Sequence, residues 1–392
     1  MLLTDEENAI INGEQGPTKQ MALTTLVKYG DVYGAEKLVS ISRSHVVMPT
    51  GASFLNPYLD ILNRMVKDKL KFSVPTSINP RPFDASNPGI IAKIIYNRHE
   101  QFEDLMEQLG VISNYSCTPY FGDNTPAAGE VLGFAESSAV VYTNSVIGAR
   151  TNRNSSVIEI CSAIIGKTPA FGLLMDENRQ ADYLVEVECQ EINYSLLGCF
   201  VGQKVRESVP YYTGLPDDSS PGQLKDLGAA SAAFGAVGLF HVENVTPDAR
   251  DLGRKLLKQN CQVLKVTDHD LSIFEQSITK PDRPNLIIIG CPHLSSQQLD
   301  HWAELIDKPV KTETWLVTAP NNLAVFKNNP QYQKLIRNRV KLMTLCPLGF
   351  MELPQLRRLR VLSNSGKLVC YTNAFYGNDE YCLHAMYGKV GK

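Results

Sequence analysis

The sequence predicts an α/β protein with mostly parallel sheets and helices on both sheet faces. Helical and strand-like segments alternate along nearly all of its 392 residues, as is typical of parallel strands joined by crossover helices. Three cysteines, Cys117, Cys291 and Cys346, each follow an apolar run and stand just before a proline. Because parallel strands gather their carboxyl ends at one edge of a sheet, we expect these thiols to converge.

Helix-start signals and apolar spacing define the elements of the first half. Thr4-Asp5-Glu6-Glu7 matches a capping box, in which the threonine and glutamate side chains satisfy backbone groups at the start of a helix. Pro17 suits the first turn of the next helix, and glycines close several later ones. In order, the pattern predicts helices at 17–33, 57–69, 99–109 and 155–165, and strand-like runs at 70–74 and 139–142.

The second half continues the alternation. It predicts helices at 247–259 and 295–305, and strands at 263–266, 286–289, 315–318 and 340–345. Between the halves, Thr213–Gly222 holds two glycines, two prolines, two aspartates and two serines, a composition typical of a linker. We therefore expect one α/β domain at 1–213, which carries Cys117, and another at 214–392, which carries Cys291, Cys346 and Lys367.

The bulk composition is that of an ordinary soluble protein. The net charge is −3 with 20% charged residues, so no global attraction to nucleic acid is expected. No run approaches the roughly 18 apolar residues that a membrane helix needs, and the acidic first residues are unlike a signal peptide. We expect a cytoplasmic protein without a nucleic-acid or membrane partner.

The nine cysteines are too few for a secreted disulfide scaffold in so long a chain, so we expect reduced thiols. The chain has no Cys-x-x-Cys pair and no zinc-finger spacing, so any metal site has to be assembled by the fold. Three converging thiolates suit an iron–sulfur cluster with one iron left open. The alternative, that these cysteines are small buried hydrophobes, is equally open at this point.

The order of motifs along the chain resembles the catalytic large subunit of the aconitase X family. The stretch Asn144-Ser145-Val146-Ile147-Gly148-Ala149-Arg150-Thr151-Asn152-Arg153 is long and unusual enough to be specific, whereas the short cysteine contexts alone are not. The other matching stretches are 3–7, 12–16, 33–38, 75–79, 116–120, 176–179, 290–294 and 363–367. The resemblance implies an aconitase-like fold with two or three domains around a central cleft.

Members of this family are dehydratases that remove water from a small 3-hydroxy carboxylate, either mevalonate 5-phosphate or cis-3-hydroxy-L-proline. The resemblance implies that Cys117, Cys291 and Cys346 hold an iron–sulfur cluster, whose open iron acts as a Lewis acid on the departing hydroxyl. Members differ in cluster type, so the number of irons does not carry over. Elimination also builds negative charge beside the carboxylate, which calls for cationic and amide donors.

Candidates for these donors lie in the matching motifs. Arg150 is the leading one, because the apolar run 139–142 is expected to bring its motif to the carboxyl end of a strand beside Cys117. The alternative interpretation, taken from the residues without the resemblance, is that an arginine in a loop pairs with a surface acid and that residues 176–179 are a solvated turn. Lys367 follows the turn Ser363–Gly366, as at many anion sites. The resemblance implies substrate contacts for Ser77, Asn79, Arg150, Thr151, Asn152, Arg179 and Lys367, with Arg153 and Asn178 as further donors.

His45 follows the apolar run 38–41 and has two interpretations, a proton shuttle or a satisfied core histidine. The resemblance places it among the substrate-binding residues. Family members usually follow this histidine with a small segment containing glycine and serine, whereas this chain has Val46-Val47-Met48-Pro49-Thr50-Gly51. The difference bears on the choice of substrate.

Aconitase-type enzymes need a small swivel domain that closes over the cluster and, in this family, supplies the serine thought to act as the base. We expect this chain to lack that domain and to bind a separate small subunit that provides it. Phosphomevalonate enzymes have two subunits, and single-chain relatives resemble hydroxyproline enzymes, although split bacterial hydroxyproline enzymes exist. We therefore lean towards mevalonate 5-phosphate. The alternatives from another class are a non-catalytic iron–sulfur or zinc protein that binds a small molecule, and a scaffold without a cluster.

Overall fold

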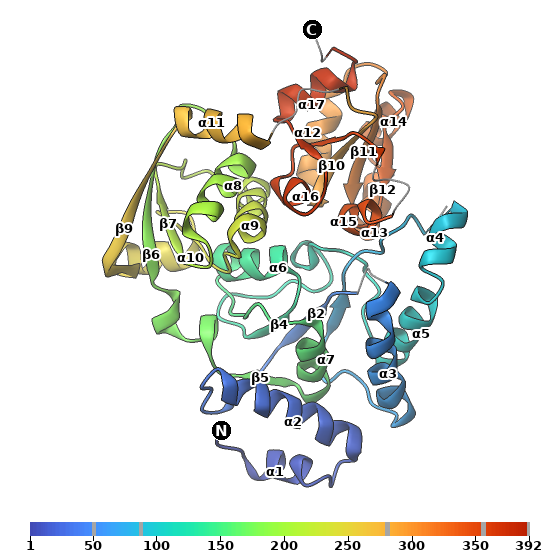
Figure 1. Ribbon diagram of the computed structural model, residues 1–392, viewed down its shortest axis with the longest axis vertical. Coiled ribbons are helices and arrows are strands. Elements are labelled where there is room, and N and C mark those ends of the chain that lie inside the picture. Colours follow the sequence, from blue (N-terminus) through green and yellow to red (C-terminus); the bar gives the residue numbers. More distant parts are fainter. Residues whose placement is uncertain (49–51, 86–88, 279–282, 354–357, 390–392) are drawn as a thin grey trace.

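Three parallel sheets organise the chain into three lobes in the computed structural model, which describes residues 1–48, 52–85, 89–278, 283–353 and 358–389. In Figure 1 the N-terminal lobe (residues 1–178) lies at the bottom of the view. The middle lobe (181–278) lies at the upper left and the C-terminal lobe (283–389) at the upper right. Strands alternate with helices in every lobe, as the sequence pattern predicts.

The N-terminal lobe is built on a three-stranded parallel sheet in the order β3-β2-β4. Thr4 and Glu7 form the expected capping box at the start of α1, and Pro17 begins α2. A short antiparallel pair, β1 and β5, lies outside this sheet. The elements are α1 (Asp5–Ile11), α2 (Pro17–Val32), β1 (Leu38–Ser40), β2 (Arg43–Val46), α3 (Ala52–Lys67), β3 (Thr76–Ile78), α4 (Gly89–Ile95), α5 (His99–Leu109), β4 (Leu132–Phe134), α6 (Ser137–Tyr142), α7 (Ser156–Ile165) and β5 (Lys167–Pro169).

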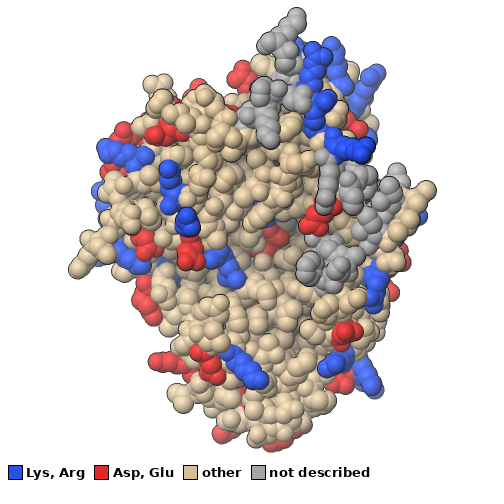
Figure 2. All heavy atoms as spheres, in the orientation of Figure 1, with Lys and Arg blue, Asp and Glu red and all other residues tan. Residues whose placement is uncertain are grey.

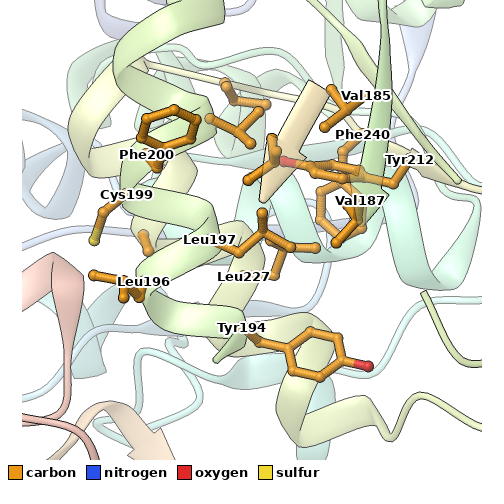
Figure 3. Packing of buried hydrophobic residues seen from close by; sticks show 14 of the residues in the cluster. Val185, Val187, Tyr194, Leu196, Leu197, Cys199, Phe200, Tyr212, Leu227 and Phe240 are labelled. Atoms are coloured by element: carbon orange, nitrogen blue, oxygen red, sulfur yellow. The ribbon is translucent and has the colours of Figure 1, made fainter. Parts of the chain in front are cut away.

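The middle lobe has a four-stranded parallel sheet in the order β8-β7-β6-β9. Its core lies between the sheet and the helices α8 and α9, where Leu197 and Leu227 face Val185 and Tyr212 (Figure 3). Its elements are β6 (Ala181–Glu188), α8 (Tyr194–Val205), β7 (Pro210–Thr213), α9 (Pro221–Gly235), β8 (His241–Val242), α10 (Pro247–Leu252), β9 (Leu257–Thr267) and α11 (Asp268–Ile278).

Close packing of α8 on α9 depends on glycines. A Cβ atom at Gly198 would meet the backbone oxygen of Leu227, and one at Gly235 would meet the backbone oxygen of Gly202. Because a side chain at either position would overlap backbone of the facing helix, only glycine allows the two helices to approach this closely. This contact sets the position of α9, which reaches the site described below.

The C-terminal lobe has a five-stranded parallel sheet in the order β12-β11-β10-β13-β14. Every residue of the central strand β10 is buried, with Leu286 and Ile288 in one core and Ile287 and Ile289 in the core on the opposite face. Such a continuous apolar run is typical of a strand covered by helices on both faces. The elements are β10 (Leu286–Leu294), α12 (Ser296–Leu305), β11 (Glu313–Thr318), α13 (Pro320–Phe326), α14 (Pro330–Arg337), β12 (Lys341–Met343), α15 (Pro347–Met351), β13 (Val361–Ser363), α16 (Gly366–Tyr371), β14 (Phe375–Tyr376) and α17 (Asp379–Met386).

Two predicted strands are wrong. Residues 70–74 do not pair in a sheet, because the N–H groups of Phe72 and Ser73 donate to Leu109 and Ala163 near the ends of α5 and α7, and β3 begins only after Pro75. The run 139–142 is helical and belongs to α6. Four buried apolar residues cannot distinguish a strand from a buried helix by periodicity alone.

Two other predictions need correction. The helix expected at 247–259 ends at Leu252, because Gly253 has φ +54°, and β9 begins at Leu257. The segment Thr213–Gly222, which the composition favours as a domain boundary, joins β7 to α9 within the middle lobe. Its turn residues serve a loop between a strand and a helix of one sheet layer.

No helix among the described residues combines the length and the apolar character that crossing a membrane requires.

Candidate active site at three cysteine loops

The three predicted cysteines come from three different loops that meet between the lobes. Cys117 follows an isolated bridge between Ser77 and Ile112 in the N-terminal lobe, and Cys291 lies inside β10, where the ladder to β11 is irregular. Cys346 follows β12 and caps α15. Cys346 raises the pKa of both Cys117 and Cys291, and Cys117 raises that of Cys291, which places all three in one electrostatic neighbourhood.

His293 joins the three loops. Its backbone N–H donates to Cys117 Sγ over 3.3 Å, and it lies two residues after Cys291 in β10. Its ring Nε2 donates to the carbonyl oxygen of Leu345, the residue before Cys346, over 3.1 Å. Burial lowers the pKa of His293 to about 4, so the ring is neutral at pH 7.

Further contacts hold the segments of Cys291 and Cys346 in place. Lys225, on α9, is buried and donates to the carbonyl of His293 over 3.0 Å and to Gln298 Oε1 over 2.6 Å. In the third loop, the N–H of Cys346 donates to the carbonyl of Arg81 over 2.6 Å, and Cys346 Sγ accepts from the N–H of Gly349 over 3.5 Å. All three lobes therefore take part in placing the thiols.

Burial makes the thiolate form of these cysteines costly. It raises the pKa of Cys117 to about 12 and of Cys346 to about 11, and it raises that of Cys291 as well. A thiolate is the form that ligates metals, and positive irons would offset this cost. Cys117 and Cys291 are buried and Cys346 is half-buried, and N–H groups donate to the sulfurs of Cys117 and Cys346, so the three thiols fit the ligand set of an iron–sulfur cluster.

The described residues include no group of three or more histidine, cysteine, aspartate or glutamate side chains arranged to hold a single metal ion. An iron–sulfur cluster makes a different demand, because each of its cysteines ligates its own iron and the sulfur atoms are further apart.

A buried ion pair lies beside the thiols. Lys367 Nζ, near the start of α16, contacts Glu136 Oε1 and donates to Ser138 Oγ over 3.2 Å. Burial alone would lower the pKa of Lys367 and raise that of Glu136, but each charge stabilises the other, so the pKa of Lys367 is raised and that of Glu136 is lowered. Lys367, which the sequence motif singles out, thus lies beside the cysteines, whereas Glu136 was not anticipated from the sequence.

His45 also belongs to this group. Its Nδ1 lies 2.8 Å from Ser77 Oγ, which accepts from Asn124 Nδ2 over 2.7 Å. The Ser77 hydroxyl is thus free to donate to Nδ1, which leaves the proton of the neutral ring on Nε2. That Nε2 is buried without a hydrogen-bond partner among the described residues, and burial lowers the pKa of His45 to about 4. Glu136 lies close enough to influence this pKa.

Two adjoining cavities border the site. The larger, of about 730 Å³, lies between the middle and C-terminal lobes and is lined by Cys291 and Lys367. The smaller, of about 350 Å³, is lined by Ser116 and Thr118 on either side of Cys117. Figure 2 shows the surface hollowed near the centre of the view, where the lobes meet. A small substrate can therefore reach the cysteine loops.

Several predicted donors are engaged elsewhere. Arg150 donates to the Leu174 carbonyl over 2.8 Å and pairs with Asp176, while Arg179 is buried and bonds to Asp248 and Asn144. The contacts of Arg179 join the N-terminal and middle lobes, whereas those of Arg150 lie within the N-terminal lobe. Three other predicted contact residues bond to backbone groups. Thr151 bonds to Phe134, Asn152 to Phe171 and Leu173, and Asn79 to Met48. The structure thus brings Lys367 beside the cysteines and His45, with Ser77, near Glu136, and it gives the other residues contacts that stabilise the chain.

The motif 144–153 does not follow a strand, because residues 143–147 continue α6 as a π-helical turn. Part of the segment after His45, Pro49–Gly51, lies outside the described residues. Four residues of the site were missed: Glu136, Lys225, Asn124 and His293. Glu136 stands two residues after β4, so a search for acids at strand ends could have found it. His293 stands in the matching stretch 290–294, whereas the sequence around Lys225 and Asn124 gives no such signal.

The chain is similar to known proteins along nearly its whole length. Residues 1–177 match the family model described as the aconitase X first domain, and 181–275 match the aconitase X second domain. The large subunit of phosphomevalonate dehydratase from Thermococcus kodakarensis is 34% identical over 81% of each chain. Cis-3-hydroxy-L-proline dehydratase from Hypocrea jecorina is 27% identical over 97% of this chain and 66% of its own length. A crystal structure of Thermococcus kodakaraensis aconitase X in its holo-form superposes with a TM-score of 0.88, at 31% identity, over 98% of this chain and 99% of that one.

Proposed function

Because this chain belongs to the aconitase X family, whose curated relatives are dehydratases, we propose that it is the large subunit of a dehydratase that removes water from mevalonate 5-phosphate. The observation that carries the proposal is the meeting of three cysteine loops beside Lys367. The lean towards the phosphorylated substrate is supported by the relative named phosphomevalonate dehydratase large subunit, which matches over equal shares of both chains.

In this proposal Cys117, Cys291 and Cys346 hold an iron–sulfur cluster. When bound, such a cluster supplies a Lewis acid for the hydroxyl that leaves. The protein's part is to bury the thiols, to donate the His293 N–H to Cys117 Sγ and to fix the loops through Lys225. One similar protein is named a large subunit, which supports a partner subunit for this chain. A similar structure is described as a holo-form, which supports a cofactor.

The ion pair of Lys367 and Glu136 gives the site a positive group that is already desolvated. Lys367 lines the larger cavity, where its ammonium group is placed to attract the substrate carboxylate as negative charge builds beside it. Its partner Glu136 holds the ammonium in position and becomes the acceptor for any proton that the lysine gives up.

In this proposal His45 donates a hydrogen bond and not a proton, because its ring is neutral at pH 7. In the tautomer that the Ser77 hydroxyl favours by donating to Nδ1, the ring carries its proton on Nε2 and presents one N–H donor. A neutral imidazole N–H can hydrogen-bond the leaving hydroxyl and limit the negative charge that develops there. The base that removes the carbon-bound proton would come from a small swivel-domain subunit, which we propose as the partner.

Reconstitution tests this function. The chain, purified anaerobically with iron and sulfide, should dehydrate mevalonate 5-phosphate only together with the small subunit. Mevalonate 5-phosphate and cis-3-hydroxy-L-proline should be assayed side by side, because the relative from Hypocrea jecorina keeps the second substrate as the alternative. Turnover of neither compound, with the cluster and the partner both present, would refute the proposal.

A further inference from the structure

The smaller cavity is lined by polar and apolar residues without charge. None of its described lining residues is charged, and it adjoins the larger cavity through Leu294 and Gln297, which line both. On one side the smaller cavity is lined by Ser116 and Thr118, which flank Cys117. A ligand that reacts at the cysteines can therefore extend one end into this cavity, and only neutral groups would receive it.

Helix α12 points its N-terminus at the junction of the two cavities. Ser295 caps this ten-residue helix by accepting from the N–H of Gln298 over 3.2 Å. The first N–H groups of a helix have no acceptor within it, and those of Ser296 and Gln297 have no hydrogen bond to the rest of the described chain. Together with the helix dipole they favour an anion at this point.

Asn114 provides a second, independent indication of a ligand. Its side chain lines the smaller cavity and only 6% of the residue is exposed, yet its Oδ1 has no hydrogen-bond partner among the described residues. A buried amide oxygen left without a donor is costly. A ligand that carries both anionic oxygens and one O–H group would satisfy the helix N–H groups and Asn114 at once.

We propose that this cavity binds the phosphate monoester of the substrate, with the carboxylate end at Lys367 and the cysteines. A phosphate monoester has a second pKa near 6, so it offers oxygen acceptors and, in its monoanion, one P–O–H donor. This inference rests on the proposed function and deepens it, because cis-3-hydroxy-L-proline has no such group. The uncharged lining, which relies on backbone N–H groups, would then be the determinant of specificity.

A substitution at the first position of α12 tests the N–H group directly. Ser296→Pro removes one backbone N–H at a position where proline is tolerated, and Ser295, with φ −73° and ψ 169°, has the extended conformation that a following proline requires. Ser296→Ala lacks the same hydroxyl but keeps the N–H, so the two variants together isolate it. Asp5→Pro, at the first position of the distant α1, controls for proline at a helix start. Thermal unfolding verifies that each variant is folded.

Binding of mevalonate 5-phosphate and of mevalonate to the full chain should be measured by titration calorimetry. We expect wild type to bind the phosphate ester at least tenfold more tightly. Ser296→Pro should lose about tenfold for the ester relative to Ser296→Ala, as for one hydrogen bond to a charged group, and should bind mevalonate unchanged. Asn114→Leu should weaken only the ester.

Equal affinity for the two compounds, or equal affinity of Ser296→Pro and Ser296→Ala for the ester, would overturn the subsite. Turnover by the reconstituted enzyme separates this failure from that of the function. If mevalonate 5-phosphate is dehydrated with a KM that Ser296→Pro leaves unchanged, only the subsite is wrong. If cis-3-hydroxy-L-proline alone is dehydrated, the proposed substrate is wrong.

Discussion

Lys225 donates to the carbonyl of His293 over 3.0 Å, and this bond ties the middle lobe to the strand that carries Cys291. Both residues are buried, and the same ammonium also contacts Gln298 Oε1 and Asp226. Since His293 in turn donates to Cys117 Sγ, a helix of one lobe fixes a cysteine loop of each of the other two. The position of the thiols is thus a property of all three lobes.

Lys225→Met should therefore reduce iron content as well as stability. The substitution leaves buried carbonyl oxygens without their donor, which should lower the free energy of unfolding by about 2–4 kcal/mol. Urea unfolding measures the stability, and iron per chain after anaerobic reconstitution measures the site. Lys37→Met, at an exposed position, is the matched control and should alter neither quantity. Full iron content in the Lys225 variant would show that the lysine has no part in placing Cys291.

Replacement of single cysteines should separate ligands from buried thiols. Cys117→Ser, Cys291→Ser and Cys346→Ser should each abolish the visible absorption of the anaerobically purified protein, because a cluster held by three thiolates does not survive the loss of one. Cys161→Ser, Cys189→Ser and Cys370→Ser should keep it, since none of these residues lies among the three loops. If the two groups of variants lost the absorption alike, the ligand assignment would have to be abandoned.

The pair Lys367–Glu136 should be coupled in stability. Lys367→Met leaves a buried carboxylate without its counter-ion, which costs about 3–5 kcal/mol for pairs of this kind. Glu136→Gln combined with Lys367→Met removes both charges and should recover much of that loss. A double-mutant cycle by urea unfolding gives the coupling free energy. A coupling below about 0.5 kcal/mol would contradict the buried pair, and both single variants should also lose dehydratase activity.

The buried carboxyl group of Glu159 should cause the free energy of unfolding to decrease as pH rises. This carboxyl is fully buried in α7, and burial raises its pKa to about 8 from 4.5. Because the folded state holds the proton more tightly than the unfolded state, the contribution is complete below pH 4.5 and is lost progressively up to about pH 8. Glu159→Gln should raise the free energy of unfolding at pH 8 by roughly 2–4 kcal/mol relative to wild type and change it little at pH 4.5. Unfolding curves that show the same difference at both values would contradict this assignment.

Local signals were reliable where local physics decides the structure. Thr4 and Glu7 formed their capping box, the helices expected at 155–165 and 295–305 formed, and the apolar run 286–289 became the buried centre of β10. These elements depend on hydrogen bonds within a few residues or on a continuous apolar run. The runs 70–74 and 139–142 failed because their conformation depends on partners more than 20 residues away, or on burial from all sides.

The sequence by itself determined the α/β alternation, the three cysteines set apart by their context, and Lys367 as a cation near them. Only the tertiary structure decided that Glu136 neutralises this lysine and that Lys225 and His293 hold the loops, because these contacts join residues from 52 to 231 positions apart. It also assigned Arg150 to contacts within the N-terminal lobe and Arg179 to contacts between lobes. Sequence patterns report which groups a chain offers, whereas charge pairing and burial depend on which of those groups the fold brings within a few ångströms.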